Sequence, residues 1–386
     1  MKILILVSRI PYPLEKGDKL RAYHHIKHLS RNNEIILCCL NDLKNTKDYT
    51  SHLQPFCKKI HIIDLPALSI LINLFKAFIK KKPLQIGYFF NKKAKKTIDK
   101  IIKLEKPDRI FCQLIRVTEY VKDYNINKTL DYQDVFSTGM KRIEQYSPFY
   151  LKWIYKLEAK RLKHYESNIF DYFNKKIIIS APDRNEIHHK NKKDIHIIPN
   201  GIDLNFFTKI EASKTFDLVF VGNMSYYPNV VSVLYLAKEI LPLVKKQIPN
   251  IKLLIAGAKP VKKILKLQSE DITVKGWVDD IRHCYASAKI FIAPMLIGTG
   301  LQNKLLEAMA MQLPCITSPL ANDALKAINN KEIIVCNNSD AYANAITELI
   351  NNPDKAHEIA LNGNKFVSAN YNWDILNTQL ENIILL

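Results

Sequence analysis

The feature that most constrains the fold is the stretch 288–320, where two short apolar runs flank a glycine loop and a helical pattern. Ile290–Pro294 and Pro314–Ser318 have the length and composition of buried strands. Between them, the Gly-Thr-Gly sequence at 298–300 permits a tight turn and a close approach of the backbone. Leu301–Met311 contains no glycine or proline and is rich in good helix formers. The stretch therefore predicts one strand–loop–helix–strand unit.

Lys304 and Glu307 give this predicted unit its chemistry. A helix N-terminus suits a phosphate group because it offers unpaired N–H groups and a partial positive charge. Lys304 and Glu307 are three residues apart, so they share a helix face near that end. Lys304 would meet a diphosphate, and Glu307 would accept hydrogen bonds from a ribose or sugar hydroxyl. A plain turn beside a solvated Lys–Glu pair stays equally open, because short glycine motifs often occur by chance.

The alternation of strand and helix patterns runs along all 386 residues, a length that predicts two domains. Lys2–Ser8 and Glu34–Leu40 read as strands that enclose a loop with Gly17 and Asp18 and a helix over Lys19–Leu29. The pattern restarts near Asn200-Gly201, a strong turn signal. We expect an α/β protein with domains over 1–195 and 196–371 and a last helix, 372–386, that packs back on the first domain. Ligands of such sheets collect in loops at the carboxyl ends of strands, which makes Gly17 and Asp18 candidates.

Composition favours an anionic partner. The chain has 57 Lys and Arg against 37 Asp and Glu, a formal net charge of +20, which attracts phosphorylated substrates, acidic lipids or nucleic acid. A general lysine bias of the source would give the same excess. The seven cysteines form no CxxC pair, which indicates a reducing compartment without a zinc site. No apolar run reaches bilayer length, so we expect a cytoplasmic protein, at most peripheral on the inner face of the cytoplasmic membrane.

Two basic segments have competing interpretations. Residues 68–82 are apolar for ten positions and then strongly basic, and aromatic and lysine residues follow at 88–96. An amphipathic basic helix suits an anionic membrane surface, so 68–96 is a candidate membrane contact, although a core helix with a solvated lysine end is slightly favoured. The basic, aromatic stretch 147–173 could bind nucleic acid, but its near-helical spacing favours a packed face. We therefore expect no nucleic-acid partner.

Several stretches together resemble the retaining GT-B glycosyltransferases called group 1, or family 4. These are IIPNGIDLNFF (197–207), LVFVGNMSYYPN (218–229), LLIAGA (253–258), VKGWVDD (274–280), IFIAP (290–294) and GTGLQNKLLEAMAMQLPCITS (298–318). The segment 9–29 looks like the first loop and helix of a polysaccharide-associated subgroup. The resemblance implies the GT-B fold, in which two Rossmann-like β/α/β domains face a cleft, the first on the acceptor side and the second binding the donor.

The resemblance also implies an activity. A sugar passes from a nucleotide-diphosphate donor, a UDP- or GDP-sugar, to a glycan or lipid-linked acceptor of surface polysaccharide synthesis. Anomeric configuration is retained, and neither a metal nor another cofactor is required. A nucleotide-sugar epimerase on the same fold and a degenerate, non-enzymatic binding protein are the alternatives. Fold alone does not separate them.

Family roles carry over only where residues match. Glu307 matches the second glutamate of the E-x7-E signature, whereas Thr299 replaces the first. Asp134 matches the aspartate of a mid-domain His-Asp pair, whereas Gln133 replaces the histidine. The expected catalytic residues are Asp134, Lys304 and Glu307, and the acceptor-side loop holds Gly17 and Asp18. The expected donor-binding residues are Gly222, Asn223, Gly298, Thr299, Gly300, Leu301, Lys304 and Glu307.

Overall fold

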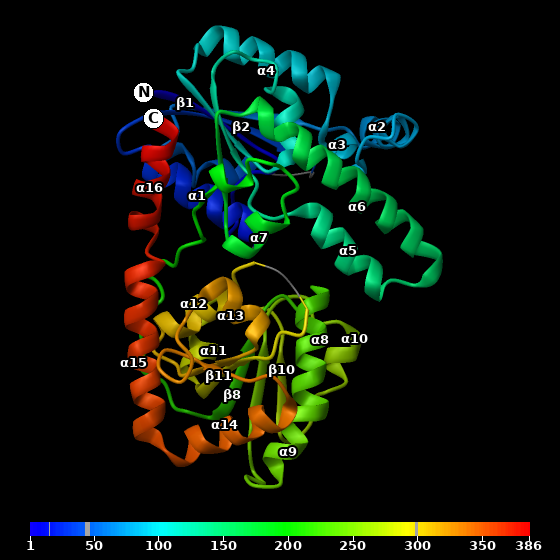
Figure 1. Ribbon diagram of the computed structural model, residues 1–386. Coiled ribbons are helices and arrows are strands. Elements are labelled where there is room, and N and C mark those ends of the chain that lie inside the picture. The colour runs from blue at the N-terminus through cyan, green and yellow to red at the C-terminus, as the bar shows by residue number, and fades with distance from the viewer. Residues whose placement is uncertain (15, 43–46, 298–299) are drawn as a thin grey trace. The chain divides into compact units, whose positions relative to one another are not determined.

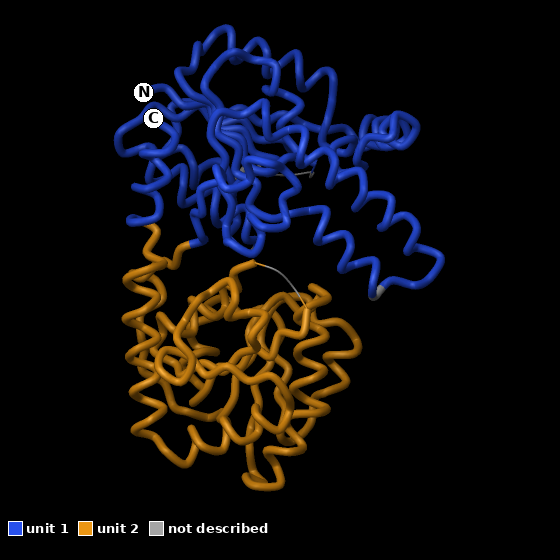
Figure 2. The backbone as a smooth tube through the Cα atoms, viewed as in Figure 1, with its two compact units in different colours: residues 1–200, 374–386 blue, residues 201–373 orange. Residues whose placement is uncertain are grey.

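The computed structural model (Figure 1) describes residues 1–14, 16–42, 47–297 and 300–386. It divides into two compact units (Figure 2). Unit 1 comprises Met1–Asn200 and Asp374–Leu386, and unit 2 comprises Gly201–Trp373. The chain thus leaves unit 1 at Asn200 and returns to it at Asp374, where the sequence placed the divisions at 195/196 and 371/372.

Unit 1 is built on a parallel sheet in the order β3-β2-β1-β4-β5-β6-β7. Its strands are β1 (Lys2–Val7), β2 (Glu34–Asn41), β3 (Lys59–Asp64), β4 (Arg109–Gln113), β5 (Asn127–Asp131), β6 (Lys175–Ile178) and β7 (His196–Ile197). β1 is central because it is apolar on both faces. Leu4 and Leu6 pack in one core with β2 and the helix α4 (Lys92–Glu105). Ile3 and Ile5 pack in the other core with α1 (Gly17–Leu29) and α16 (Trp373–Leu385).

The remaining helices of unit 1 connect these strands or extend from them. They are α2 (Ala67–Ile79), α3 (Leu84–Phe89), α5 (Phe136–Tyr146), α6 (Phe149–Ile169) and α7 (Ala181–Glu186), with short 3-10 turns at Lys47–Thr50, Gln54–Phe56, Ile115–Tyr120, Phe170–Tyr172 and Lys192–Asp194. α16 contributes Leu376, Leu380 and Ile384 to the core beneath β1. The last helix of the chain therefore forms part of unit 1, because its apolar side is buried there.

Unit 2 repeats the arrangement, with a parallel sheet in the order β10-β9-β8-β11-β12-β13. Its strands are β8 (Phe216–Val221), β9 (Leu253–Ala256), β10 (Ile272–Lys275), β11 (Ala288–Ala293), β12 (Cys315–Thr317) and β13 (Ile334–Val335). Its helices are α8 (Tyr227–Tyr235), a π-helical turn (Leu236–Ile240), α9 (Leu241–Lys245), α10 (Lys262–Leu265), α11 (Arg282–Ala286), α12 (Asn303–Ala310), α13 (Pro319–Leu325), α14 (Ser339–Asn351) and α15 (Pro353–Asn370). In both units the first strand is central and the order reverses beside it, so ligands are expected at the carboxyl ends of these strands.

Three local predictions were wrong. Gly17 and Asp18 begin α1 instead of forming a loop before it. The apolar pattern over Val230–Gln247 predicts one continuous α-helix, but a π-helical turn at Leu236–Ile240 interrupts it, next to Pro242, whose missing N–H cannot continue the α-helical ladder. The slightly favoured core position of the helix over 68–82 is also wrong, because most of its large apolar side chains are exposed. In the described part of the chain, the helices are all too short or too polar to span a bilayer.

Candidate functional site

The backbone after β8 lies unusually close to other groups of unit 2. A Cβ atom on Gly222 would fall 2.6 Å from Nδ2 of Asn229 and 3.5 Å from Nζ of Lys304. Gly257, which follows β9, has a φ of +135°, and a Cβ there would fall 1.9 Å from the carbonyl oxygen of Gly222. The absence of side chains at both glycines brings the ends of β8 and β9 together beside Lys304.

Lys304 lies in the first turn of α12 and is buried. Its ammonium donates a hydrogen bond to Oδ1 of Asn229, lies 3.8 Å from Sδ of Met295 and sits 4.8 Å from the ring centre of Phe220. Burial lowers the pKa of Lys304 to about 7, against the opposing effect of Glu307. Among the described residues, the groups that contact this ammonium are all neutral, so a bound anion would supply the charge that the buried ammonium lacks.

Glu307 lies one turn further along α12 and is oriented by Tyr285 of α11. The phenol of Tyr285 donates a hydrogen bond of 2.6 Å to Oε2 of Glu307 and also lies 3.4 Å from the carbonyl oxygen of Lys304. Burial raises the pKa of Glu307, while Tyr285 and Lys304 oppose the rise. One oxygen of Glu307 is thus held by Tyr285, and the other has no hydrogen bond among the described residues.

The structure brings several predicted donor residues together and leaves others outside its description. Gly222, Lys304 and Glu307 lie near one another at the carboxyl ends of β8 and β11. The carbonyl of Asn223 accepts a hydrogen bond of 2.9 Å from Asn229, the residue that also contacts Lys304. Gly300 has a φ of +71°, Leu301 is buried, and α12 begins at Asn303 instead of Leu301. Gly298 and Thr299 lie outside the described residues.

The candidate acceptor residues form a separate cluster in unit 1. Gln133 and Asp134 follow β5, and Gln133 has a φ of +59°, a sparsely populated backbone region for this residue type. Nε2 of Gln113 donates to the carbonyl of Asp18 at 2.8 Å and to Oε1 of Gln133 at 3.3 Å. Gly17 faces Gln133, since a Cβ there would lie 4.0 Å from its Nε2. The first residues of α1 and the turn after β5 therefore meet at one edge of the sheet.

The pKa of Asp134, in this cluster, is raised strongly. Burial and the nearby carboxylates of Asp183 and Asp131 raise the pKa of Asp134 to about 7, although Arg21 opposes the rise. A carboxyl group with a pKa near the working pH can take up or release a proton during a reaction. Asp134 is therefore chemically suited to the role that the sequence assigned to it.

Sequence reasoning missed the ion pair that supports this cluster. Nε of Arg21 donates a hydrogen bond of 2.6 Å to Asp131, and both side chains are fully buried. Arg21 also donates to the carbonyl of Pro199 at 3.1 Å and to Asn200 at 3.2 Å. One side chain thus joins α1, the end of β5 and the last two residues of the first segment of unit 1. Its partners lie 110 and more residues away in the sequence, so no local pattern could reveal them.

Metal ligands do not gather in the described ranges: no three His, Cys, Asp or Glu side chains there converge on a point that could hold a metal ion.

An apolar helix face is exposed elsewhere in unit 1. Ile70 and Ala77 are the buried side chains of α2. Leu74 is partly buried against the core, whereas the six remaining large apolar residues are exposed, and Phe75 is 68% exposed. They are Leu68, Leu71, Ile72, Phe75, Phe78 and Ile79. An exposed apolar surface of this kind marks a contact with a membrane or a partner.

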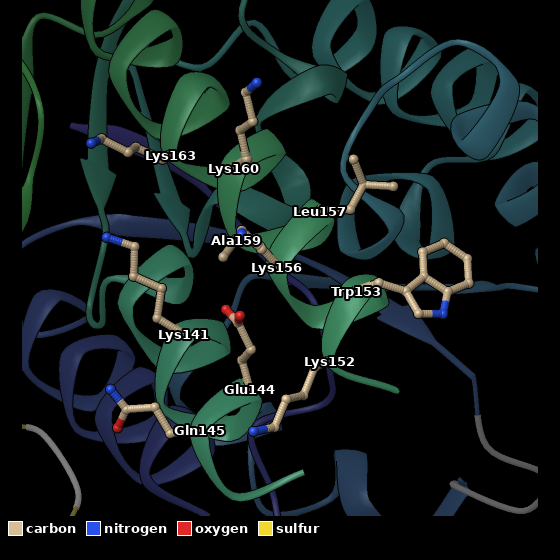
Figure 3. Close-up of a pocket in the computed structure, with 10 residues that line it drawn as sticks. All are labelled: Lys141, Glu144, Gln145, Lys152, Trp153, Lys156, Leu157, Ala159, Lys160 and Lys163. Carbon is tan, nitrogen blue, oxygen red and sulfur yellow. The ribbon is translucent and has the colours of Figure 1, made fainter. Parts of the chain in front are cut away.

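A basic groove lies between α5 and α6, close to that face. Its volume is about 830 Å³. We call it the lysine groove, and Figure 3 shows the side chains that line it, which are Lys141, Glu144, Gln145, Lys152, Trp153, Lys156, Leu157, Ala159, Lys160 and Lys163. It contains five lysines and one carboxylate. The packed-face interpretation of 147–173 therefore holds for only part of α6, since Lys152, Trp153, Lys156 and Lys160 are exposed.

Two successive parallel α/β units with this strand order define the fold of the GT-B glycosyltransferases, and the predicted fold class is confirmed. Residues 215–352 match the family model described as "Glycosyl transferases group 1", which supports a glycosyltransferase. An uncharacterized 44.6 kDa protein in the cps region of Klebsiella pneumoniae is 24% identical over 395 residues, 96% of each chain.

Solved structures agree on the fold. HepE of Anabaena, in complex with UDP and glucose, superposes with a TM-score of 0.69 at 14% identity, over 99% of this chain and 98% of that chain. WaaG, a glycosyltransferase involved in lipopolysaccharide biosynthesis, superposes with a TM-score of 0.66 at 15% identity, over 100% and 99% of the two chains.

Proposed function

We propose that this protein is a family 4 glycosyltransferase that moves a sugar from a UDP- or GDP-sugar to a glycan or lipid-linked acceptor, with retention of anomeric configuration and without a metal. The environment of Lys304 carries the proposal. The buried ammonium lies beside Glu307, and its contacts with the described residues are with neutral groups, which matches the need of a nucleoside diphosphate for positive charge. HepE, whose fold is similar, was crystallised with UDP and glucose.

The chemistry follows from these groups. A nucleoside diphosphate leaves more readily when its developing charge is neutralised, and Lys304 with the first turn of α12 would do this. Glu307 would fix the ribose or the sugar through its free oxygen. When the acceptor hydroxyl attacks the sugar from the same face that the nucleoside diphosphate leaves, the leaving phosphate oxygen can take the proton of that hydroxyl. Gln133 in place of histidine is then tolerable, and Asp134 would orient the acceptor hydroxyl and relay its proton to that phosphate oxygen.

The proposed acceptor and membrane location rest on the net positive charge of the chain and on the exposed apolar face of α2. We assign the protein to surface polysaccharide synthesis at the inner face of the cytoplasmic membrane, with residues 68–96 contacting anionic lipid. The Klebsiella relative lies in a cps region, and WaaG acts in lipopolysaccharide biosynthesis. An apolar helix face flanked by lysines binds the interface between head groups and acyl chains.

A thermal-shift screen tests donor binding. UDP, GDP, ADP, CMP and dTDP and their sugars would be added to the wild type and to Glu307→Gln, with Glu348→Gln on the exposed side of α14 as the matched control. A ligand that binds only the folded state raises the melting midpoint. We expect one nucleotide family to raise it in the wild type and the control but not in Glu307→Gln. No shift with any nucleotide would favour a degenerate binding protein.

Product analysis tests the reaction itself. The anomeric coupling constant of the isolated glycoside should match that of the donor, and activity should survive a chelator. Inversion, or loss of activity that added metal restores, would contradict the proposed mechanism. Release of an isomerised nucleotide-sugar without an acceptor would instead identify an epimerase.

A further inference from the structure

The lysines of the groove have no charged or hydrogen-bonding partner among the residues that the structure describes. Within the described chain, none of Lys141, Lys152, Lys156, Lys160 and Lys163 makes a hydrogen bond or ion pair. Other lysines of unit 1 do: Lys59 pairs with Glu105 at 2.6 Å and Lys122 with Glu119 at 3.1 Å. The cations of the groove therefore keep their full capacity to bind an anion.

The regular spacing of these lysines is a second reason to expect a bound anion. Lys152, Lys156 and Lys160 recur every fourth residue of α6, so they form a row on one side of the helix. Like charges at this spacing repel one another and destabilise a helix slightly. Figure 3 shows that Lys141 of α5 and Lys163 of α6 extend toward the same side of the groove. An anion between the helices would relieve this repulsion, and a lysine ammonium is a common phosphate ligand.

Apolar side chains beside the groove indicate that this anion belongs to a lipid. The first turns of α6 expose Phe149, Tyr150 and Trp153, of which Phe149 is 85% exposed. Aromatic residues with a polar edge concentrate where hydrocarbon meets head groups. A soluble acidic glycan would account for the lysines but not for an exposed phenylalanine.

The exposed face of α2 is joined to the same helix. Arg161 of α6 donates hydrogen bonds to the carbonyls of Phe78 at 3.1 Å and Lys82 at 3.3 Å, and its guanidinium sits 5.3 Å from the ring centre of Phe78. Figure 1 shows α2 and α6 on the same side of unit 1. A bilayer contacted by α2 would therefore bring its head groups near the groove.

We infer that the lysine groove binds the phosphate groups of a lipid-linked acceptor, a polyprenyl diphosphate that carries the growing glycan, while its lipid remains in the bilayer. The inference rests on the proposed function and specifies the acceptor class. The groove volume of about 830 Å³ lies within the range of small-ligand sites, so it admits a diphosphate with its first sugar. The lysines would hold the phosphates, and Trp153 would pack against the sugar or the first isoprene unit.

Vesicle flotation of the full chain tests the inference. The vesicles are phosphatidylcholine alone, phosphatidylcholine with phosphatidylglycerol, and phosphatidylcholine with undecaprenyl diphosphate at equal negative charge. The groove variant is Lys152→Glu with Lys156→Glu and Lys160→Glu. The matched control is Lys262→Glu with Lys263→Glu and Lys266→Glu, three exposed lysines on and beside α10 in unit 2. Circular dichroism and the melting midpoint without lipid verify that each variant folds.

We expect the wild type and the control to bind diphosphate vesicles at least about tenfold more tightly than phosphatidylglycerol vesicles. The groove variant should lose this preference and bind diphosphate vesicles about 100-fold more weakly, since each of the three lysines contributes about fivefold near an anionic surface. Equal binding of the two anionic vesicles by the wild type would overturn the inference, and so would a preference that survives in the groove variant. Binding of duplex DNA through the groove without a lipid preference would assign it to nucleic acid instead.

The nucleotide-induced rise in melting midpoint separates this result from the proposed function, because it reports on unit 2. A wild type that shows the rise but no lipid preference would refute the acceptor site alone. A wild type without the rise would refute glycosyl transfer whatever the vesicles show.

Discussion

The phenol of Tyr285 donates a hydrogen bond of 2.6 Å to Oε2 of Glu307, so a residue of α11 orients the carboxylate of α12. Tyr285 is buried and has no polar group other than this hydroxyl. Its role is to position Glu307, since only the second oxygen of the carboxylate remains for a ligand.

We predict that Tyr285→Phe raises KM for the donor about tenfold, the effect of losing one hydrogen bond to a charged group, with a smaller change in kcat. Steady-state kinetics with the donor found by the thermal-shift screen measure this. Tyr371→Phe is the control, because Tyr371 is also buried in unit 2 and donates a hydrogen bond of 2.7 Å, to the carbonyl of Leu325. Equal KM values for the two variants would show that Tyr285 only supports the fold.

Lys304 should give folding stability a distinctive pH dependence. Its pKa in the folded protein is about 7, below the ordinary value of 10.5. Between these values the unfolded chain binds more protons than the folded protein, so the contribution of this residue to stability rises with pH from 7 to 10.5. We predict that Lys304→Met abolishes this part of the rise in urea unfolding curves and also abolishes donor turnover.

Lys262→Met, which alters an exposed lysine, should keep the pH dependence of the wild type. If Lys304→Met showed the same dependence as the wild type, the buried ammonium would not be the group that titrates. Donor affinity in the wild type should fall as the pH rises through about 7, because the protonated form of Lys304 attracts the diphosphate.

Asp134 should control activity in a similar pH range, but through a carboxyl group instead of an amine. Its pKa of about 7 is above the ordinary 3.8, so the carboxylate form predominates only above neutral pH. Ionisation of Asp134 should produce a rising limb near pH 7 in the pH profile of kcat/KM, while deprotonation of Lys304 produces the falling limb. Asp134→Asn should remove the rising limb and lower kcat about 100-fold, the lower range for general base catalysis. Asp171→Asn, an exposed position, is the control. An unchanged pH profile in Asp134→Asn would exclude this role.

The parts of the fold that could be predicted are those that produce a local apolar pattern in the sequence. β1 and β11 are continuous apolar runs because parallel strands are buried on both faces, and both were found where the sequence placed them. The spacing of Lys304 and Glu307 predicted that they share one helix, and both lie on α12. Tyr285 could not be found, because a single tyrosine in the five-residue helix Arg282–Ala286 has no pattern that distinguishes a core position from a site.

Long-range contacts and surface features could not be predicted from local sequence patterns, for different reasons. The Arg21–Asp131 pair joins residues 110 positions apart, and only the sheet order brings them together. The amphipathic pattern of α2 was correctly read, but a helix pattern does not say whether its apolar side meets a core or solvent. The lysine row of α6 was visible as basic residues, whereas the groove exists only because α5 packs beside α6.

Among the described glycines of unit 2, Gly257 should be the least replaceable. A Cβ there would lie 1.9 Å from the carbonyl oxygen of Gly222, at a φ of +135° that other residues rarely adopt. We predict that Gly257→Ala lowers the free energy of unfolding by about 3 kcal/mol or more, from backbone strain and steric clash, as measured by urea unfolding. Gly276→Ala is the control, since a Cβ at Gly276 meets no atom within 4 Å. Similar losses in both variants would contradict the close approach.

The exposed face of α2 should bind membranes through its apolar residues. We predict that Leu71→Glu with Phe75→Glu weakens binding to phosphatidylglycerol vesicles about 100-fold, because burial of two large apolar side chains is lost and two negative charges meet an anionic surface. The melting midpoint should stay within a few degrees of the wild type, since both residues are exposed. Leu104→Glu is the control, because Leu104 on α4 is 75% exposed and lies outside this face. Unchanged vesicle binding in the α2 variant would show that the protein meets the bilayer elsewhere, and a loss shared by Leu104→Glu would reduce the effect to net charge.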